Sequence, residues 1–245
     1  MDNNANPREI KQQLRERIWN LLEQEKVTSF PRPVWGRIPN FLGSHEAALR
    51  LMQLPEVKDA QVVKVNPDSP QIPIRRLLLQ SGKNLIMATP RMREGFLLID
   101  PSRIPENRLL SAGTIKGAFT FGRKVELRTL PKIDFIVEGS VAVNAKGGRI
   151  GKGEGYAELE YAILKELVLV SEKTRIATTV HDLQIVEEFP LELYDVPIDY
   201  IATPTKMIPT NSTYPRPRGI LWDLLEETKI KEIPILEELK RHIAS

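Results

Sequence analysis

Short apolar runs rich in β-branched residues alternate with segments of helical periodicity through most of the chain. Runs of this length between turn residues are typical of buried strands. We expect strands at residues 61–65, 84–88, 96–99, 133–137, 175–180 and 198–202. We expect helices among them at residues 74–80 and 156–170. Because parallel strands are joined through helices that cover the sheet, this alternation predicts an α/β fold with a mainly parallel sheet and helices on both faces.

The amino-terminal region carries its own helix and loop signals. Asn6 can cap a helix with Pro7 in its first turn, and apolar residues then recur at helical spacing up to Leu22. Three prolines within residues 30–39 exclude a regular helix and predict an extended arm or a loop. A second helix is expected at residues 44–53.

The carboxy-terminal region differs in composition from the rest. Beyond residue 205 the chain is rich in Pro, Asn, Ser and Thr, and two short helices are expected at residues 220–227 and 234–242. Their apolar faces need a partner to cover them. We therefore expect one α/β domain over residues 1–205 and a helical extension over residues 206–245 that packs on it.

Composition narrows the function classes. The 245 residues contain no cysteine and three scattered histidines, which excludes disulfides and thiolate metal sites and disfavours a histidine metal site. No apolar run reaches membrane length and the first ten residues are polar, so we expect a soluble, cytoplasmic protein without a membrane partner. The net charge of +3 is compatible with a basic pocket for an anion and equally with a mildly basic surface.

The glycine-rich stretch 147–158 is the most informative segment for chemistry. Glycines at 151, 153 and 155 let the backbone turn and approach a ligand, and a helix begins near Tyr156. The free N–H groups at a helix start favour phosphate, and Arg149 and Lys152 add cationic donors. The carboxylate of Glu158 could hold the Mg²⁺ of a nucleotide. The pattern therefore indicates a nucleoside-phosphate site; the alternative is a glycine turn without a ligand.

Further motifs join this loop into a resemblance. They are Lys11-x-x-x-Arg15, the segment from Gly147 to Glu158, Gln184, and Asp195-x-x-x-Asp199. Together they resemble the 5-formyltetrahydrofolate cyclo-ligase family. The segments 30–33, 37–41, 65–68, 89–91, 151–157 and 200–205 look like its methenyltetrahydrofolate synthetase domain-containing branch.

The resemblance implies a three-layer fold shared with ribose-5-phosphate isomerase-like and CoA-transferase-like proteins. It also implies an enzyme that uses ATP and Mg²⁺ to phosphorylate the formyl oxygen of 5-formyltetrahydrofolate, or of a related formylated pterin. Nitrogen N10 then attacks the activated carbon, and the products are the 5,10-methenyl form, ADP and phosphate. Such chemistry depends on positioning and charge neutralisation more than on a protein nucleophile.

Site residues carried over by position fall into four groups. Arg149 and Lys152 are the expected catalytic residues. The expected ATP-binding residues are Lys11, Arg15, Arg149, Gly151, Lys152, Gly153, Glu154, Gly155 and Tyr156. Glu158 and Asp195 are the expected metal ligands. The expected substrate-binding residues are Asp68, Arg91 and Tyr156.

Departures from the family pattern leave other functions open. Glu154 places a carboxylate beside the expected phosphates, which weakens ATP binding unless it points away, and Ala157 replaces an aromatic residue. The main alternative is a non-catalytic module on the same scaffold that binds a nucleotide or RNA. An isomerase-like activity rests on fold analogy alone. Without the motif context, Lys11 and Arg15 would be read as solvated charges on a helix.

Overall fold

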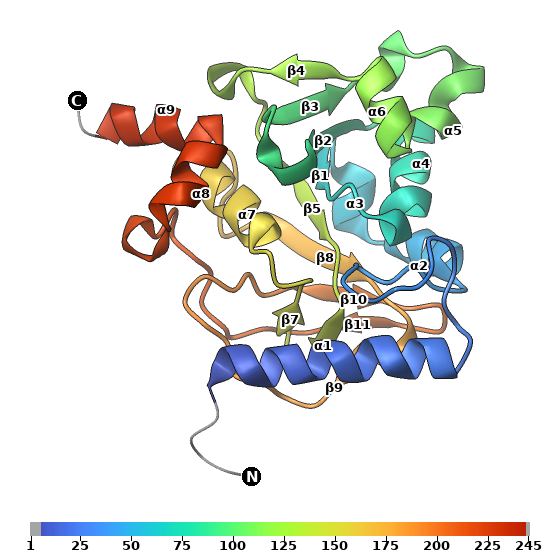
Figure 1. Cartoon of the computed structure of the whole chain (residues 1–245). Coiled ribbons are helices and arrows are strands. Elements are labelled where there is room, and N and C mark those ends of the chain that lie inside the picture. Colours follow the sequence, from blue (N-terminus) through green and yellow to red (C-terminus); the bar gives the residue numbers. More distant parts are fainter. Residues whose placement is uncertain (1–5, 244–245) are drawn as a thin grey trace.

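The structure is a computed structural model that describes residues 6–243. Within this range eight strands form one sheet in the order β11–β10–β8–β5–β1–β2–β3–β4 (Figure 1). Their bounds are β1 (Val62–Val65), β2 (Asn84–Ala88), β3 (Phe96–Ile99), β4 (Arg123–Val125), β5 (Phe135–Glu138), β8 (Arg175–Thr179), β10 (Tyr200–Ala202) and β11 (Met207–Pro209). The central strands β10, β8, β5, β1 and β2 are parallel, and β11, β3 and β4 pair antiparallel at the edges. This confirms the mainly parallel sheet of the predicted α/β fold.

Helices cover both faces of the sheet, each over its own hydrophobic core. One face carries α2 (Ser44–Leu51), α3 (Pro55–Asp59), α4 (Ile72–Gln80), α5 (Leu109–Ala112) and α6 (Ile115–Phe121). The other carries α7 (Tyr156–Glu166), α8 (Glu227–Glu232) and α9 (Pro234–Ile243). Successive strand residues alternate between the cores. In β1, Val63 and Val65 face the α4 side, so Lys64 between them faces α7.

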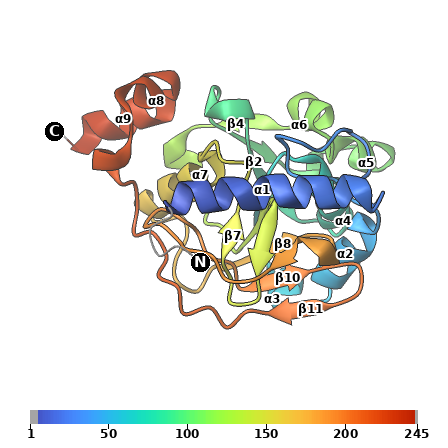
Figure 2. The same ribbon diagram turned by 60° about the horizontal axis from the view of Figure 1, so that its bottom comes forward.

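The long helix α1 (Pro7–Gln24) lies across a second, smaller sheet (Figures 1 and 2). Its start is as predicted, because Asn6 Oδ1 accepts a hydrogen bond from the Arg8 amide at 3.1 Å and Pro7 occupies the first turn. The smaller sheet consists of β7 (Arg149–Ile150), β6 (Ala142–Asn144) and β9 (Ile185–Val186). Ile18 and Leu22 of α1 are buried against it. This packing determines which side of α1 faces the glycine loop, which we define as residues 151–155.

The carboxy-terminal helices lie beside α7, at the far end of the molecule from α2 (Figure 1). Ile230, Ile233 and Leu236 are buried in the same core as Ile163 and Leu164 of α7. Buried residues between Ile220 and Leu239 therefore share a hydrophobic core with the sheet, of which β11 at residues 207–209 is itself a strand.

Several details differ from the sequence-based expectations. Two strands that the sequence did not predict, β6 and β7, lie between β5 and the glycine loop. The expected helix at 220–227 is wrong: Leu225 and Glu226 have extended backbone angles, so only a short 3₁₀ turn forms at Trp222–Leu224 and α8 begins at Glu227. The helix expected to reach residue 170 ends at Glu166, and Val168 is left-handed at φ 57°. No helix within residues 6–243 has both the length and the apolarity that a membrane crossing requires.

Candidate active site

Two cavities adjoin the glycine loop, one on each side of it. The first has a volume of about 550 Å³ and the second about 510 Å³. Both are lined by the loop and by the two charged residues under it, which are Gly151, Gly153, Glu154, Gly155, Arg149 and Glu158. The loop therefore separates the two cavities and borders both of them. We call this loop the partition.

Local backbone requirements explain the glycines of the partition. The loop leaves β7 and enters α7, with Gly153 at φ 98° and Gly155 at φ 74° as the residue that caps α7. Both angles are costly for residues with a Cβ. At Gly153 a Cβ would also lie 3.2 Å from Cζ of Arg15. The amino-terminal end of α7, where free amides favour anions, begins directly after the loop.

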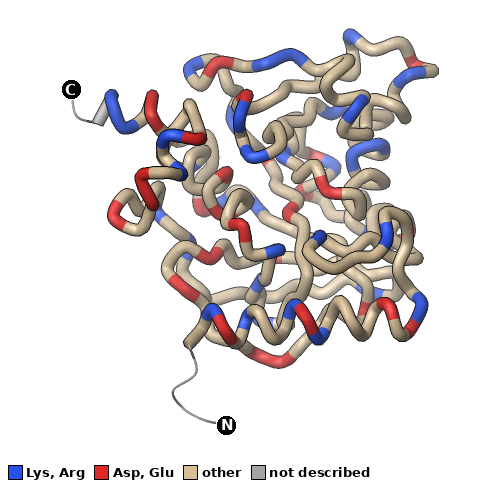
Figure 3. The backbone as a smooth tube through the Cα atoms, in the orientation of Figure 1, with Lys and Arg blue, Asp and Glu red and all other residues tan. Residues whose placement is uncertain are grey.

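The second cavity is lined by the amino-terminal cations. Arg8, Lys11 and Arg15 approach it from α1, whose charges of both signs are visible in Figure 3. Arg15 is half-buried, its Nε donates to the carbonyl oxygen of Gly151 at 2.8 Å, and burial lowers its pKa. Lys11 is buried and paired with Asp195, and its Nζ is 2.9 Å from Oε2 of Glu192. Arg15 is thus bound to the loop itself, while Lys11 neutralises two carboxylates beside it.

Arg149 and Glu158 lie beneath the partition. The buried Arg149 donates from Nη1 to the carbonyl oxygen of Gly139 at 2.6 Å, and its Nη2 donates to Oε1 of Glu158. Its Nε is buried with no partner among the described residues. Arg149 therefore connects the strand that precedes the loop to the helix that follows it, in addition to lining both cavities.

The two expected metal ligands, Asp195 and Glu158, differ in the hydrogen bonds that their carboxylates already accept. Oδ2 of Asp195 accepts from Lys11 and, at 2.6 Å, from the Glu192 amide, and burial raises the pKa of Asp195. Glu158 uses Oε1 for Arg149, and its Oε2 accepts no hydrogen bond within residues 6–243. That range contains no group of three or more metal-ligating side chains. Mg²⁺ on a nucleotide needs one or two protein carboxylates, so Glu158 fits this role and Asp195 fits it less well.

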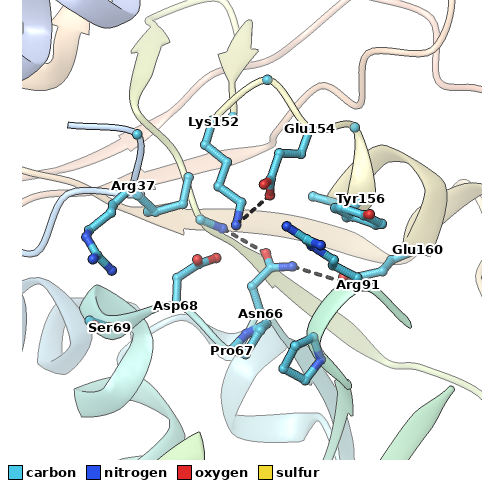
Figure 4. A pocket seen from close by; sticks show the side chains of 18 of the residues that line it. Arg37, Asn66, Pro67, Asp68, Ser69, Arg91, Lys152, Glu154, Tyr156 and Glu160 are labelled. Atoms are coloured by element: carbon cyan, nitrogen blue, oxygen red, sulfur yellow. Dashed lines mark hydrogen bonds and ion pairs between the residues drawn. The ribbon is translucent and has the colours of Figure 1, made fainter. Parts of the chain in front are cut away.

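The first cavity contains the predicted substrate residues (Figure 4). Asp68, Arg91 and Tyr156 line it together with Lys152, which the sequence had placed beside the ATP phosphates. Nζ of Lys152 is 2.7 Å from Oε2 of Glu154, so the carboxylate that departs from the family pattern is neutralised locally. Burial raises the pKa of Asp68, although Lys152 opposes this rise.

The proline-rich arm forms another wall of the first cavity. Pro31, Trp35, Arg37 and Ile38 all line it, and no residue of the arm is helical, as predicted. Trp35 is half exposed, and its Nε1 donates to Oδ1 of Asn20 at 2.9 Å. An aromatic ring and a guanidinium therefore lie at this wall.

A buried charge network lies under the first cavity. Lys64 Nζ is 2.7 Å from Oε1 of Glu138 and 2.6 Å from Oε2 of Glu160. Asn66 donates from Nδ2 to the same Glu160 oxygen at 3.0 Å and accepts from the Gly139 amide at 2.8 Å. Asn66 and Glu160 line the cavity. The network holds two carboxylates and one ammonium, so one carboxylate proton makes it neutral.

Sequence reasoning missed this network, although the sequence carries a signal for it. Lys64 lies inside the otherwise apolar strand β1, and Glu138 is the last residue of the otherwise apolar strand β5. A buried strand tolerates a charge only if the charge has a partner. Two such strands that are neighbours in the sheet therefore predict an ion pair. Glu160 had no comparable signal, because a glutamate in a helix is usually solvated.

Two further motif residues have structural roles. Nε2 of the buried Gln184 donates to the carbonyl oxygens of Ser140 and Val141 at 3.0 and 3.1 Å. Asp199 is paired with Arg216, outside both cavities. These residues stabilise the segments around the site without lining it.

The fold and site define an α/β protein in which a glycine loop at a helix start separates two polar cavities. The sequence model of the 5-formyltetrahydrofolate cyclo-ligase family matches residues 7–204. The chain belongs to this family.

Curated relatives agree with this assignment. The chain is 42% identical over 234 residues to the mouse protein named methenyltetrahydrofolate synthase domain-containing protein, an alignment that covers 94% of this chain and 63% of the mouse protein. The human protein of that name is also 42% identical, with 61% of its length covered. The chain thus spans about three fifths of these relatives. The 5-formyltetrahydrofolate cyclo-ligase of Escherichia coli K12 is 24% identical over 169 residues, which is 66% of this chain and 88% of that enzyme.

A solved structure supports the fold. The 5,10-methenyltetrahydrofolate synthetase of Aquifex aeolicus matches with a TM-score of 0.52 and 20% identity, over 84% of this chain and 95% of that protein. At this identity the likeness shows the fold alone.

Proposed function

We propose that the chain is an ATP-dependent cyclo-ligase that converts 5-formyltetrahydrofolate, or a related formylated pterin, to its 5,10-methenyl form with release of ADP and phosphate. Family membership supports the reaction class. The single observation that carries the proposal is the partition, because one glycine loop lines two cavities of similar volume. Two substrates bound on its two sides would meet at one helix start.

The second cavity is the proposed ATP site. Arg8 and Arg15 present cations to it, and the loop amides and the start of α7 supply donors for phosphate oxygens. Lys11 is paired with Asp195 and Glu192, so the negative charge that these two carboxylates present to a triphosphate is reduced, while Glu226 adds a further carboxylate to the cavity wall. Glu158 is the residue proposed to hold Mg²⁺, which when bound neutralises phosphate charge.

The first cavity is the proposed pterin site. Tyr156 and Trp35 offer aromatic surfaces to a flat ring system. Asp68 is suited to accept hydrogen bonds from ring N–H groups. Arg37 and Arg91 are suited to carboxylates of a substrate tail, because guanidinium binds carboxylate in a bidentate manner.

The proposed reaction needs positioning more than it needs covalent catalysis by the protein. The formyl oxygen takes the terminal phosphoryl group of ATP as the bond from that phosphorus to ADP breaks. Nitrogen N10 then attacks the formyl carbon and loses its proton, and phosphate departs with the oxygen. Lys152 would place positive charge on the pterin side of the loop, where the phosphorylated oxygen develops.

The test is turnover by the purified protein. Incubation with 5-formyltetrahydrofolate, ATP and Mg²⁺ is expected to produce the absorbance of the 5,10-methenyl product, with one ADP per product. Reactions without ATP, and with a non-hydrolysable ATP analogue, serve as controls. Absence of product together with absence of ATP binding by calorimetry contradicts the proposal.

The second candidate is a nucleotide-binding module without turnover. The Lys152–Glu154 ion pair favours this candidate, because Glu154 neutralises the ammonium group that would otherwise face the phosphorylated oxygen. ATP binding with no turnover of any formylated pterin would establish this candidate. RNA retention that falls steeply with salt would instead indicate the RNA-binding variant of it.

A further inference from the structure

Part of the second cavity is built by residues that lie outside the segment matched by the family. The match ends at residue 204. The cavity is nevertheless lined by Ile220, Leu221, Leu224, Leu225 and Lys229. We call these residues the C-terminal wall.

The C-terminal wall has two chemically different parts. Its apolar part consists of Ile220, Leu221, Leu224 and Leu225, and Leu224 remains 59% exposed although it is a large hydrophobic residue. Across the cavity, Leu159 and Ala162 of α7 add apolar surface. The cations of α1 line the same cavity, and so do the carboxylates of Glu192, Asp195 and Glu226. Lys11 is paired with Glu192 and Asp195, and Arg8 and Arg15 add positive charge. The cavity therefore combines an apolar wall with basic side chains, which suits a ligand with a flat ring and an anionic chain.

Lys229 is the cationic part of the wall and contacts the partition directly. Its Nζ donates to the carbonyl oxygen of Glu154 at 2.5 Å and lies 4.7 Å from the centre of the Tyr156 ring. A Cβ at Gly155 would lie 3.5 Å from the same nitrogen. Lys229 thus fixes the loop from the nucleotide side and reaches a ring that lines the other cavity.

We propose that the C-terminal wall completes the second cavity as a nucleoside triphosphate site, with Leu221 and Leu224 against the base and Lys229 as a positioning residue that holds the phosphate-binding loop. This inference rests on the proposed function, because it takes ATP as the ligand of that cavity. The extension is then part of the binding site as well as of the hydrophobic core.

Two variants and two probes test the proposal in the full chain. Lys229→Met is expected to raise the Kd for inorganic tripolyphosphate and for ATP by about tenfold, the usual effect of losing one charged contact. Leu224→Ser is expected to raise the Kd for ATP about fivefold and to leave that for tripolyphosphate unchanged, since it removes only apolar contact. Calorimetry measures both, and thermal unfolding without ligand checks the fold.

Matched controls separate site effects from surface effects. Lys231→Met changes an exposed lysine of the same helix, and Leu110→Ser changes an exposed leucine on α5; neither lines a cavity described above. Both are expected to bind ATP as the wild type does. Wild-type ATP affinity in Leu224→Ser overturns the base assignment, and unchanged tripolyphosphate affinity in Lys229→Met overturns the role of Lys229. A wild-type protein that binds no ATP overturns the proposed function itself.

Discussion

Lys64 Nζ lies 2.6 Å from Oε2 of Glu160, and both side chains are buried between β1 and α7. Burial raises the pKa of Glu160 to about 7 against the lowering effect of Lys64, and the nearby Glu138 carboxylate adds to the rise. Asn66 donates to the same Oε2 atom at 3.0 Å. A single oxygen of Glu160 therefore accepts both hydrogen bonds.

This geometry predicts a pH-dependent stability that Glu160→Gln removes. A carboxyl group whose pKa is higher in the folded chain binds its proton more tightly there, so stability falls as pH rises from about 4.5 to about 7. The glutamine carbonyl can accept from both donors and carries no charge. We expect the variant to gain up to about 3 kcal/mol over the wild type at pH 8 and to match it near pH 4, below the pKa of the unfolded chain.

Denaturant unfolding across this pH range measures the effect. Glu187→Gln, on an exposed residue, is the control and is expected to follow the wild-type curve. Parallel curves for wild type and Glu160→Gln would falsify the assignment of the proton to this carboxyl group.

Removing the charge of Lys11 should destabilise the protein. Lys11→Met leaves the carboxylates of Asp195 and Glu192 without their shared ammonium. Breaking a buried ion pair on one side costs about 3–5 kcal/mol. The double variant Lys11→Met/Asp195→Asn is expected to recover part of this loss, as measured by urea unfolding. A single variant as stable as the wild type would show that the pair is not formed in solution.

Arg15 should affect the nucleotide side alone. Arg15→Ala removes the hydrogen bond to the Gly151 carbonyl and one cation of the second cavity. We expect KM for ATP to rise about tenfold, as for one charged hydrogen bond, with KM for the formylated substrate unchanged. Arg17→Ala, on the exposed side of α1, is the control. Equal changes in both KM values would argue for general loop disruption.

Asp68 should affect the pterin side alone. Its carboxylate lines the first cavity and lies against Gly139, where a Cβ would be 2.9 Å from Asp68 Oδ2. We expect Asp68→Asn to raise KM for the formylated substrate about tenfold and to leave the Kd for ATP unchanged. The exposed Asp59→Asn serves as its control, in steady-state assays. A lower ATP affinity in Asp68→Asn would contradict the division into two sites.

Periodicity and turn signals were sufficient for the centre of the large sheet and its main helices, but they did not predict the edge strands β4 and β11 or the smaller sheet of β6, β7 and β9. The central strands and the helices α1, α2, α4 and α7 lie where the apolar spacing predicts them, because each buries a continuous apolar face. The local apolar pattern predicted the wrong structure where contacts with other elements determine the backbone conformation. The spacing of Leu221, Leu224 and Leu225 predicts a helix, yet Leu221 and Leu224 line a cavity and the chain between them forms only a short turn.

Sequence reasoning brought the expected site residues to one region of the fold, but it did not show that they divide between two cavities. Motif spacing brought Arg15 and the glycine loop together correctly, since Arg15 bonds to Gly151. It could not show that the loop has two faces: Lys152 was expected beside the same ligand as Arg15, yet Lys152 lines the first cavity and Arg15 the second. Lys229 was out of reach of such reasoning, because its role depends on how α8 docks.

The family match stops at residue 204, whereas the hydrophobic core continues through Ile230, Ile233 and Leu236. A protein with the same sheet and α7 but without these helices would leave part of this core open to solvent. In this chain the segment beyond the family match therefore completes the hydrophobic core as well as one wall of the second cavity.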